Sequence, residues 1–172
     1  RIPSVASIGA ARGGSTIEQQ YVKNYQLLVT AQTDAERRAA VEISPVRKLR
    51  EMRMALTLDK TFTKAEILTR YLNLLSFGNS AFGIQDAAQT YFGINASQLN
   101  WQQAALLAGL VQSESSLNPY TNPDGALQRR ESTLADVEAR LPDDKLPAYR
   151  ELLAAAALHV PKSEERHFAQ LL

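Results

Sequence analysis

The sequence predicts an all-α protein that forms a single helical domain. Apolar residues recur at helical spacing, as in Leu49, Met52 and Leu56, which stand at i, i+3 and i+7. Residues that favour helix starts precede several of these segments. Alternating apolar and polar residues, the pattern of half-buried strands, are nearly absent, and no internal repeat is visible. These observations favour helices throughout the chain.

The first part of the chain contains a glycine turn and one helix. Residues 1–12 show no period and are expected to form a loop. Gly13 and Gly14 predict a tight turn. Ser15 and Glu18 have the spacing of a capping box, so we expect a helix over about 16–30. The polar segment 30–42 is either a short helix or a mobile insert, because it has little apolar face.

Two helices follow with clear start signals. Ser44-Pro45 opens a helix over about 46–58, since serine is a good N-cap and proline fits the first helical position. Leu49, Met52 and Leu56 are expected to form its buried stripe. A second capping box, Thr63 with Glu66, precedes a helix over 65–75, and Gly78 ends it.

The C-terminal half should be helical as well. We expect a helix over 81–92 that ends at Gly93, which suits the left-handed C′ position. Asn100 should cap the most apolar helix, 101–112. Pro, Asn and Gly predict a loop over 118–125, with helices over 126–140 and from 146 onward. In the central helix the side chains expected to be buried are Trp101, Leu106, Leu107 and Leu110.

Composition excludes several classes of function. The 172 residues suit one domain, and 19 Lys and Arg against 18 Asp and Glu give a net charge of +1. Such a balance does not favour nucleic acid as a partner. There are no cysteines, and the two histidines make a His-rich metal site improbable. No stretch reaches the ~20 apolar residues of a membrane span. Arg1 is not a natural start, so we expect the sequence to be cut from a longer protein.

The stretch GGSTIEQQYVKN, residues 13–24, is the first candidate site. A helix start presents unpaired N–H groups and a positive dipole end, which suit an anion. Polar side chains along this helix start could hold a sugar–phosphate. An ordinary capped turn with no ligand is the alternative, and spacing alone favours it. The candidate binding residues are Ser15, Thr16, Gln19, Gln20 and Lys23.

The charged face of the 46–58 helix is the second candidate site. Glu51 lies one turn after Arg47 and Lys48, and Arg50 stands beside them. On spacing alone, a solvated helix with salt bridges explains these residues.

These motifs together resemble the glycosyltransferase family 51, the peptidoglycan transglycosylase domains of bifunctional penicillin-binding proteins and of monofunctional transglycosylases. GGSTIEQQYVKN resembles the second family signature, and RKLREMRMALTLDKTFTKAEILTRYLN resembles the third and fourth. NSAFGIQDAAQTYFG and LNWQQAALLAGLVQSESSLNP resemble later segments. The likeness runs from Gly13 to about Pro119, with a tail helix to about Arg140.

The resemblance implies a lysozyme-like helical fold on the outer face of the bacterial cytoplasmic membrane. It implies polymerisation of lipid II into glycan strands, with inversion and release of undecaprenyl diphosphate. Partners would be lipid II, the growing strand, the membrane surface and other cell-wall synthases. No cofactor is implied, although a divalent cation such as Mg²⁺ could assist. Glu51 matches the second catalytic carboxylate of the family. The side chains that would face the diphosphate are Lys23, Arg47, Lys48 and Arg50. Those that would bind sugar and phosphate oxygens are Ser15, Thr16, Gln19 and Gln20.

The chain departs from the family pattern in two places. No EDRxF-like string, which carries the proposed general base, stands before Gly13, so we expect the 172 residues alone to be inactive. Ile43 stands where an arginine is usual, and Arg37 or Arg38 is a weak substitute. No SxxK, SxN or KTG set of a transpeptidase is present.

Two other functions remain open. A catalytically silent scaffold or partner-binding module would keep the fold without the chemistry. A glycan-cleaving enzyme is disfavoured by the basic residues around Glu51. If the resemblance holds, Lys23 and Glu51 should point into one cleft.

Overall fold

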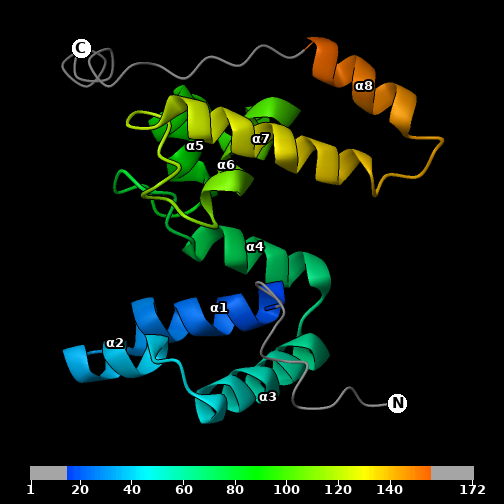
Figure 1. The fold of residues 1–172 in the computed structure, drawn as a ribbon. Helices are drawn as coiled ribbons and strands as arrows, with labels where there is room; N and C mark the ends of the chain where they lie inside the picture. Colours follow the sequence, from blue (N-terminus) through cyan, green and yellow to red (C-terminus); the bar gives the residue numbers. More distant parts are fainter. Residues whose placement is uncertain (1–14, 156–172) are drawn as a thin grey trace. The chain divides into compact units, whose positions relative to one another are not determined.

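The computed structural model describes residues 15–155, so the predicted loop 1–12 and the Gly13–Gly14 turn lie outside the described residues. Within the described range the chain forms eight α-helices and two short π and 3-10 helices, with no strand (Figure 1). One isolated bridge pairs Ser76 with Phe82. The predicted all-α class is confirmed. None of these helices combines the length and hydropathy that a membrane crossing requires.

The chain divides into two compact units at Leu74 and Leu75. In the first unit α1 lies between α3 and α4 (Figure 1). Val22 of α1, Ala55 of α3 and Ile67 of α4 are buried. The helices of this unit are α1 (Ile17–Tyr25), a π-helical continuation (Gln26–Thr30), α2 (Asp34–Val41), α3 (Pro45–Thr61) and α4 (Lys64–Leu74).

The cap of α1 is one residue later than predicted. Thr16, not Ser15, is the N-cap, and its hydroxyl accepts a hydrogen bond of 3.3 Å from the Gln19 backbone N–H. Both residues carry a hydroxyl that could serve, and the Ser15 hydroxyl instead accepts a hydrogen bond from Lys48. The predicted Ser15–Glu18 capping box is therefore wrong, although the helix begins where expected.

The polar segment after α1 contains a helix, α2. Thr33 caps it, and the Glu36 side chain bonds back to the Thr33 backbone N–H at 3.0 Å, which completes a capping box. Hydrogen bonds from the backbone N–H groups of Gln32 and Thr33 hold the pKa of Glu36 below its usual value. Ala40 is its buried residue. Of the two alternatives for this segment, the structure shows the helix.

The apolar stripe predicted to be buried on α3 is exposed. Leu49, Met52 and Leu56 are 66%, 41% and 63% exposed, whereas Glu51 and Ala55 are buried at 2% and 7%. The face of α3 that packs within the unit is thus the one with Glu51 and Ala55. A small alanine allows close helix packing there, and the carboxylate of Glu51 is neutralised by cationic neighbours on its own helix.

The described part of the second unit, residues 75–155, contains four α-helices and a short 3-10 helix. Almost fully buried side chains of this unit include Tyr91 of α5 and Leu106, Leu107 and Leu110 of α6, which packs against α7. Tyr149 of α8 is buried with Leu134 of α7 and donates a hydrogen bond of 3.0 Å to the Leu134 carbonyl. Burial raises the pKa of the Tyr149 phenol. The elements are α5 (Ile84–Phe92), a 3-10 helix (Ala96–Gln98), α6 (Trp101–Leu110), α7 (Pro123–Glu138) and α8 (Leu146–Ala155).

Three predictions for this unit need correction. The helix expected from residue 81 begins at Ile84, because Gly83 has φ 85° and cannot belong to a right-handed helix. Trp101 is 41% exposed, since it opens α6 and packs edge-on against Tyr149 at 5.2 Å. The helix expected from residue 126 begins at Pro123, because Asn122 caps it. The Asn100 cap and the Gly93 C-cap are confirmed.

Candidate active site

Glu51 is the buried charged residue of the described chain, with 2% of its surface exposed. It lies in the middle of α3 on the face turned to the rest of its unit. The Arg47 guanidinium donates to Oε1, and the Lys48 ammonium lies 3.5 Å from Oε2. Burying a lone carboxylate is costly, so both cations are needed to hold it in place. The three side chains form a charged triplet within one turn of helix.

Lys48 joins this triplet to the start of α1. Its ammonium donates a hydrogen bond to the Ser15 hydroxyl, across 33 positions of sequence. Arg47 in turn donates to the Glu42 carbonyl, just before α3. Each cation therefore contacts Glu51 and one further oxygen.

Gln20 links α1 to α4. Its amide nitrogen donates to the Ser15 carbonyl at 3.2 Å, and its amide oxygen accepts from the Tyr71 hydroxyl at 2.7 Å. Burial raises the pKa of the Tyr71 phenol, which therefore stays protonated as a donor. The Gln20 side chain is fixed at both ends. Ser15, Gln20, Lys48 and Glu51 thus belong to one polar network built on three helices.

Gln19 lies beside this network with one unused acceptor. Its Oε1 atom is buried and has no hydrogen-bond partner among the described residues. A buried amide oxygen without a donor is unfavourable by about 1–3 kcal/mol. A hydroxyl or amide of a ligand would supply the missing donor. Thr16, which caps the helix, precedes it at the helix start.

Lys23 and Arg50, two further predicted binding residues, also lie outside the network. No hydrogen bond or ion pair between described residues joins Lys23 to Glu51, so their predicted common cleft stays a prediction. Arg50 is exposed and lines a hollow of about 400 Å³ between the π-helical segment, α2 and α3. Arg47 and Gln26 line the same hollow.

Comparison with known protein families identifies the family of this chain. Residues 3–138 match the family described as Transglycosylase. The chain belongs to the transglycosylase family. The resemblance of its motifs to glycosyltransferase family 51 is thereby confirmed.

Several bacterial relatives support the same assignment for this transglycosylase chain. It is 37% identical over 136 residues to penicillin-binding protein 2a of Streptococcus pneumoniae serotype 2, which covers 79% of this chain and 17% of that protein. It is 39% identical to penicillin-binding protein 1A of Aquifex aeolicus over 123 residues, 72% of this chain and 15% of that protein. Penicillin-binding protein 1A of Haemophilus influenzae is 34% identical over 169 residues, 95% of this chain and 18% of that protein. The transglycosylase chain therefore spans less than a fifth of the length of these relatives.

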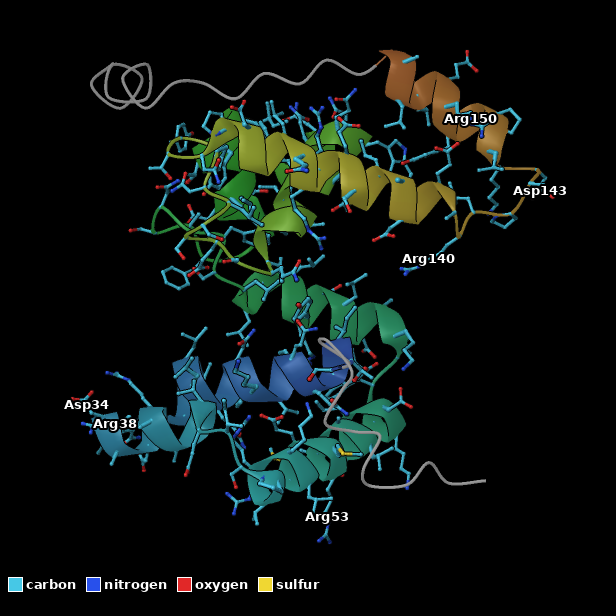
Figure 2. The ribbon with its side chains drawn as sticks, viewed as in Figure 1. Asp34, Arg38, Arg53, Arg140, Asp143 and Arg150 are labelled. Atoms are coloured by element: carbon cyan, nitrogen blue, oxygen red, sulfur yellow. The ribbon has the colours of Figure 1, made fainter. Side chains whose placement is uncertain are left out.

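Neither weak substitute for the arginine expected at position 43 reaches Glu51. Ile43 is 98% exposed. Arg37 pairs with Asp34 at 3.4 Å on α2. Arg38 lies with Asp34 at the outer end of α2 (Figure 2). Among residues 15–155, Arg47 and Lys48 provide the cations that contact the buried carboxylate.

A divalent cation on Glu51 does not fit these residues. Both carboxylate oxygens already face a cationic side chain. Within residues 15–155 no group of three or more His, Asp or Glu side chains gathers as metal ligands would. The charge that a metal ion would supply is provided here by Arg47 and Lys48.

One contact of the transglycosylase network was missed by sequence reasoning. Tyr71 orients the Gln20 amide from 51 positions away. No spacing rule connects two residues on different helices at that separation. The i, i+4 relation of Arg47 and Glu51, in contrast, was visible in the sequence.

Proposed function

We propose that the full-length gene product is a peptidoglycan glycosyltransferase that polymerises lipid II into glycan strands. Membership of the transglycosylase family and similarity to penicillin-binding proteins support this assignment. The structural observation that carries it is the buried Glu51, held between Arg47 and Lys48 next to the Ser15 hydroxyl. A carboxylate with two cations in this position is suited to a reaction at a diphosphate.

In the proposed reaction, the acceptor hydroxyl forms a C–O bond to the anomeric carbon of the growing chain. The bond from that carbon to the lipid diphosphate breaks, and the diphosphate leaves with the electron pair. The hydroxyl proton goes to a general base that the family resemblance places in the first signature. Configuration at the anomeric carbon inverts, because attack and departure occur on opposite faces.

We assign the basic residues to the departing diphosphate. Lys48 and Arg47 are held by Glu51, so their positive charge is fixed before the bond breaks, which is how preorganised charge lowers a barrier. Lys23 and Arg50 would add charge at the edge of the site. Glu51 acts in this scheme by fixing the two cations.

The polar residues at the start of α1 would bind sugar and phosphate oxygens. Gln20 is held by Tyr71 and by the Ser15 carbonyl, so it presents a fixed surface. Gln19 has a buried acceptor that a sugar hydroxyl would satisfy. Thr16 completes this polar group at the helix start.

The exposed apolar stripe on α3 supports a location at the outer face of the cytoplasmic membrane. Val46, Leu49 and Leu56 are 67%, 66% and 63% exposed, and Arg53 points away from α1 on this side (Figure 2). Apolar side chains with interspersed arginines suit the interface of an anionic lipid bilayer. Such a location would bring the site to a lipid-linked substrate. Other cell-wall synthases would be its protein partners.

The decisive experiment is the Glu51→Gln variant of the full-length gene product, assayed with lipid II. The amide keeps the shape but no longer fixes two cations. We expect polymer formation to fall by about 10²-fold or more, the effect of removing one preorganised electrostatic group. Lys60→Gln, at an exposed position near the end of the same helix, is the control and should leave activity unchanged.

Other outcomes separate the alternatives. A Glu51→Gln protein with near-normal polymerisation would contradict the proposed site. A wild-type protein that binds its partners but makes no polymer would identify the silent scaffold instead. We expect the 172-residue chain by itself to be inactive, because no carboxylate of the first signature is among its residues.

A further inference from the structure

Three charged side chains from three helices meet beside the start of α1. They are Glu18 in the first turn of α1, Asp59 near the end of α3 and Lys64 at the start of α4. The Lys64 ammonium lies 2.8 Å from Glu18 Oε1 and also bonds Asp59 Oδ1. The Glu18 side chain is 14% exposed and the Lys64 side chain is 73% exposed, so the carboxylate lies against the helices while the ammonium faces solvent. A single ammonium thus joins all three helices that carry the candidate active site.

The charges of Lys64 and Asp59 do not stabilise α3 and α4 as separate helices. Lys64 puts a positive charge at the N-terminus of α4, and Asp59 puts a negative charge in the last turn of α3. Both positions oppose the helix dipole. The charges of Lys64 and Asp59 are favourable only because the end of α3 and the start of α4 lie close together. Their interaction therefore depends on the tertiary packing of the helices.

Glu18 stands in the first turn of α1 and has a strongly lowered pKa. Hydrogen bonds from Lys64, from the Glu18 backbone N–H and from the Thr16 hydroxyl hold the pKa of Glu18 at about 2, far below its usual 4.5. Thr16 is the N-cap of the helix. The Glu18 carboxylate, two residues after this cap, is bonded to the first residue of α4.

The start of α1 carries the residues that complete the candidate site. Ser15 accepts from Lys48 of α3, and Gln20 accepts from Tyr71 of α4. A small shift of this helix start relative to α3 and α4 would lengthen both contacts. Misplacement of a binding group by about 1 Å can lower a rate by up to 10²-fold.

We propose that Glu18 and Lys64 are positioning residues, which fix the first turn of α1 against α4 so that Ser15 and Gln20 hold their places in the active site. This inference rests on the proposed glycosyltransferase function. Neither residue contacts the reacting atoms. A solvated surface ion pair would instead have no effect on the geometry of α1 and none on the rate.

The test uses Lys64 variants of the full-length gene product. Lys64→Met keeps the stem of the side chain and removes the ammonium, while Lys64→Arg keeps a cation that reaches both carboxylates. We expect Lys64→Met to lower kcat for polymerisation by about tenfold with a smaller change in KM. Lys64→Arg should restore most of the rate. Lys60→Met, an exposed lysine at the end of α3, is the matched control and should have no effect.

A second measurement does not depend on activity. Hydrogen exchange of the backbone amides in residues 17–21 should become faster in Lys64→Met than in wild type or Lys60→Met. The Glu18→Gln and Lys64→Met changes should also be non-additive, because either one breaks the same contact.

The outcomes are distinguishable. Unchanged exchange at residues 17–21 in Lys64→Met would overturn the positioning role, whatever the activity. Faster exchange with an unchanged kcat would overturn its link to catalysis. A wild-type protein without polymerase activity would contradict the proposed function, while the exchange data would still decide whether Glu18 and Lys64 fix the helix start.

Discussion

The Tyr71 hydroxyl of α4 donates a hydrogen bond of 2.7 Å to the side-chain oxygen of Gln20 on α1. Because the Gln20 nitrogen is bonded to the Ser15 carbonyl, the amide has one orientation. Tyr71 thus sets which atom of Gln20 faces the remainder of the candidate active site, although Tyr71 itself is buried at 6% exposure.

Tyr71→Phe should test this relationship. The change removes the hydroxyl and leaves the Gln20 oxygen without its donor, so we expect the chain to lose about 1 kcal/mol of unfolding free energy. Urea unfolding of the 172-residue chain measures this. Tyr25→Phe, which removes an exposed hydroxyl from α1, is the control and should be neutral. Equal midpoints for the two variants would show that the bond does not contribute.

Lys48→Met should be more damaging than Lys60→Met on the same helix. It removes one of the two cations that contact Glu51 within residues 15–155 and frees the Ser15 hydroxyl. A buried group that loses a charged partner is destabilised by about 1–3 kcal/mol, and Lys48 is 33% exposed, so we expect the lower end. Urea unfolding gives the stability, and the lipid II assay of the full-length gene product should show a matching loss of rate. A Lys48→Met protein with wild-type activity would exclude Lys48 from the site.

The stability of the chain should depend on pH through Glu18. Its pKa is lowered from 4.5 to about 2 in the folded state, chiefly by Lys64. The contact therefore stabilises the fold above about pH 4.5 and is lost as the pH falls toward about 2. Between pH 5 and pH 2, wild type should lose more unfolding free energy than Glu18→Gln, and the two should converge at the acid end. Parallel pH curves would contradict the ion pair.

Gly109→Ala should destabilise the second unit. A Cβ at this position of α6 would lie 2.9 Å from Arg129 Cγ of α7, too close for van der Waals contact. Overpacking costs about 1–3 kcal/mol, which outweighs the roughly 0.8–1 kcal/mol that alanine gains over glycine in a helix. In an Arg129→Ala background the same change should become stabilising. Thermal unfolding of the four proteins measures the reversal, and a destabilisation that persists without the arginine side chain would point to another cause.

The helices were largely predictable because their signals are local. Asn100 and Thr63 carry caps that bond within three residues of sequence, and both caps are confirmed. The start of α1 was uncertain by one residue because Ser15 and Thr16 are adjacent hydroxyls. Which one caps the helix is decided by Lys48, a residue far away in the chain.

The buried face of α3 was not predictable from periodicity. Leu49 and Leu56 define an apolar stripe, yet the helix packs through Glu51 and Ala55. Hydrophobic spacing identifies an apolar face of a helix but does not show whether another element covers it. A charged side chain that is neutralised within its own helix can be buried in place of that apolar face. The contact of Glu18 with Lys64 was invisible for a related reason, since 46 positions separate the two residues.

The origin of the Glu51 triplet within a single turn of α3 has a consequence for the order of assembly. Arg47 and Lys48 are neighbours of Glu51 at i−4 and i−3, so the three charges can meet as soon as this helix forms. Helix formation takes about a microsecond, well before distant segments dock. When α1 docks, the Glu51 carboxylate is already neutralised by Arg47 and Lys48. Docking therefore does not require the removal of water from an unpaired anion. The barrier to docking α1 on α3 should therefore be set by the formation of the contact between Ser15 and Lys48.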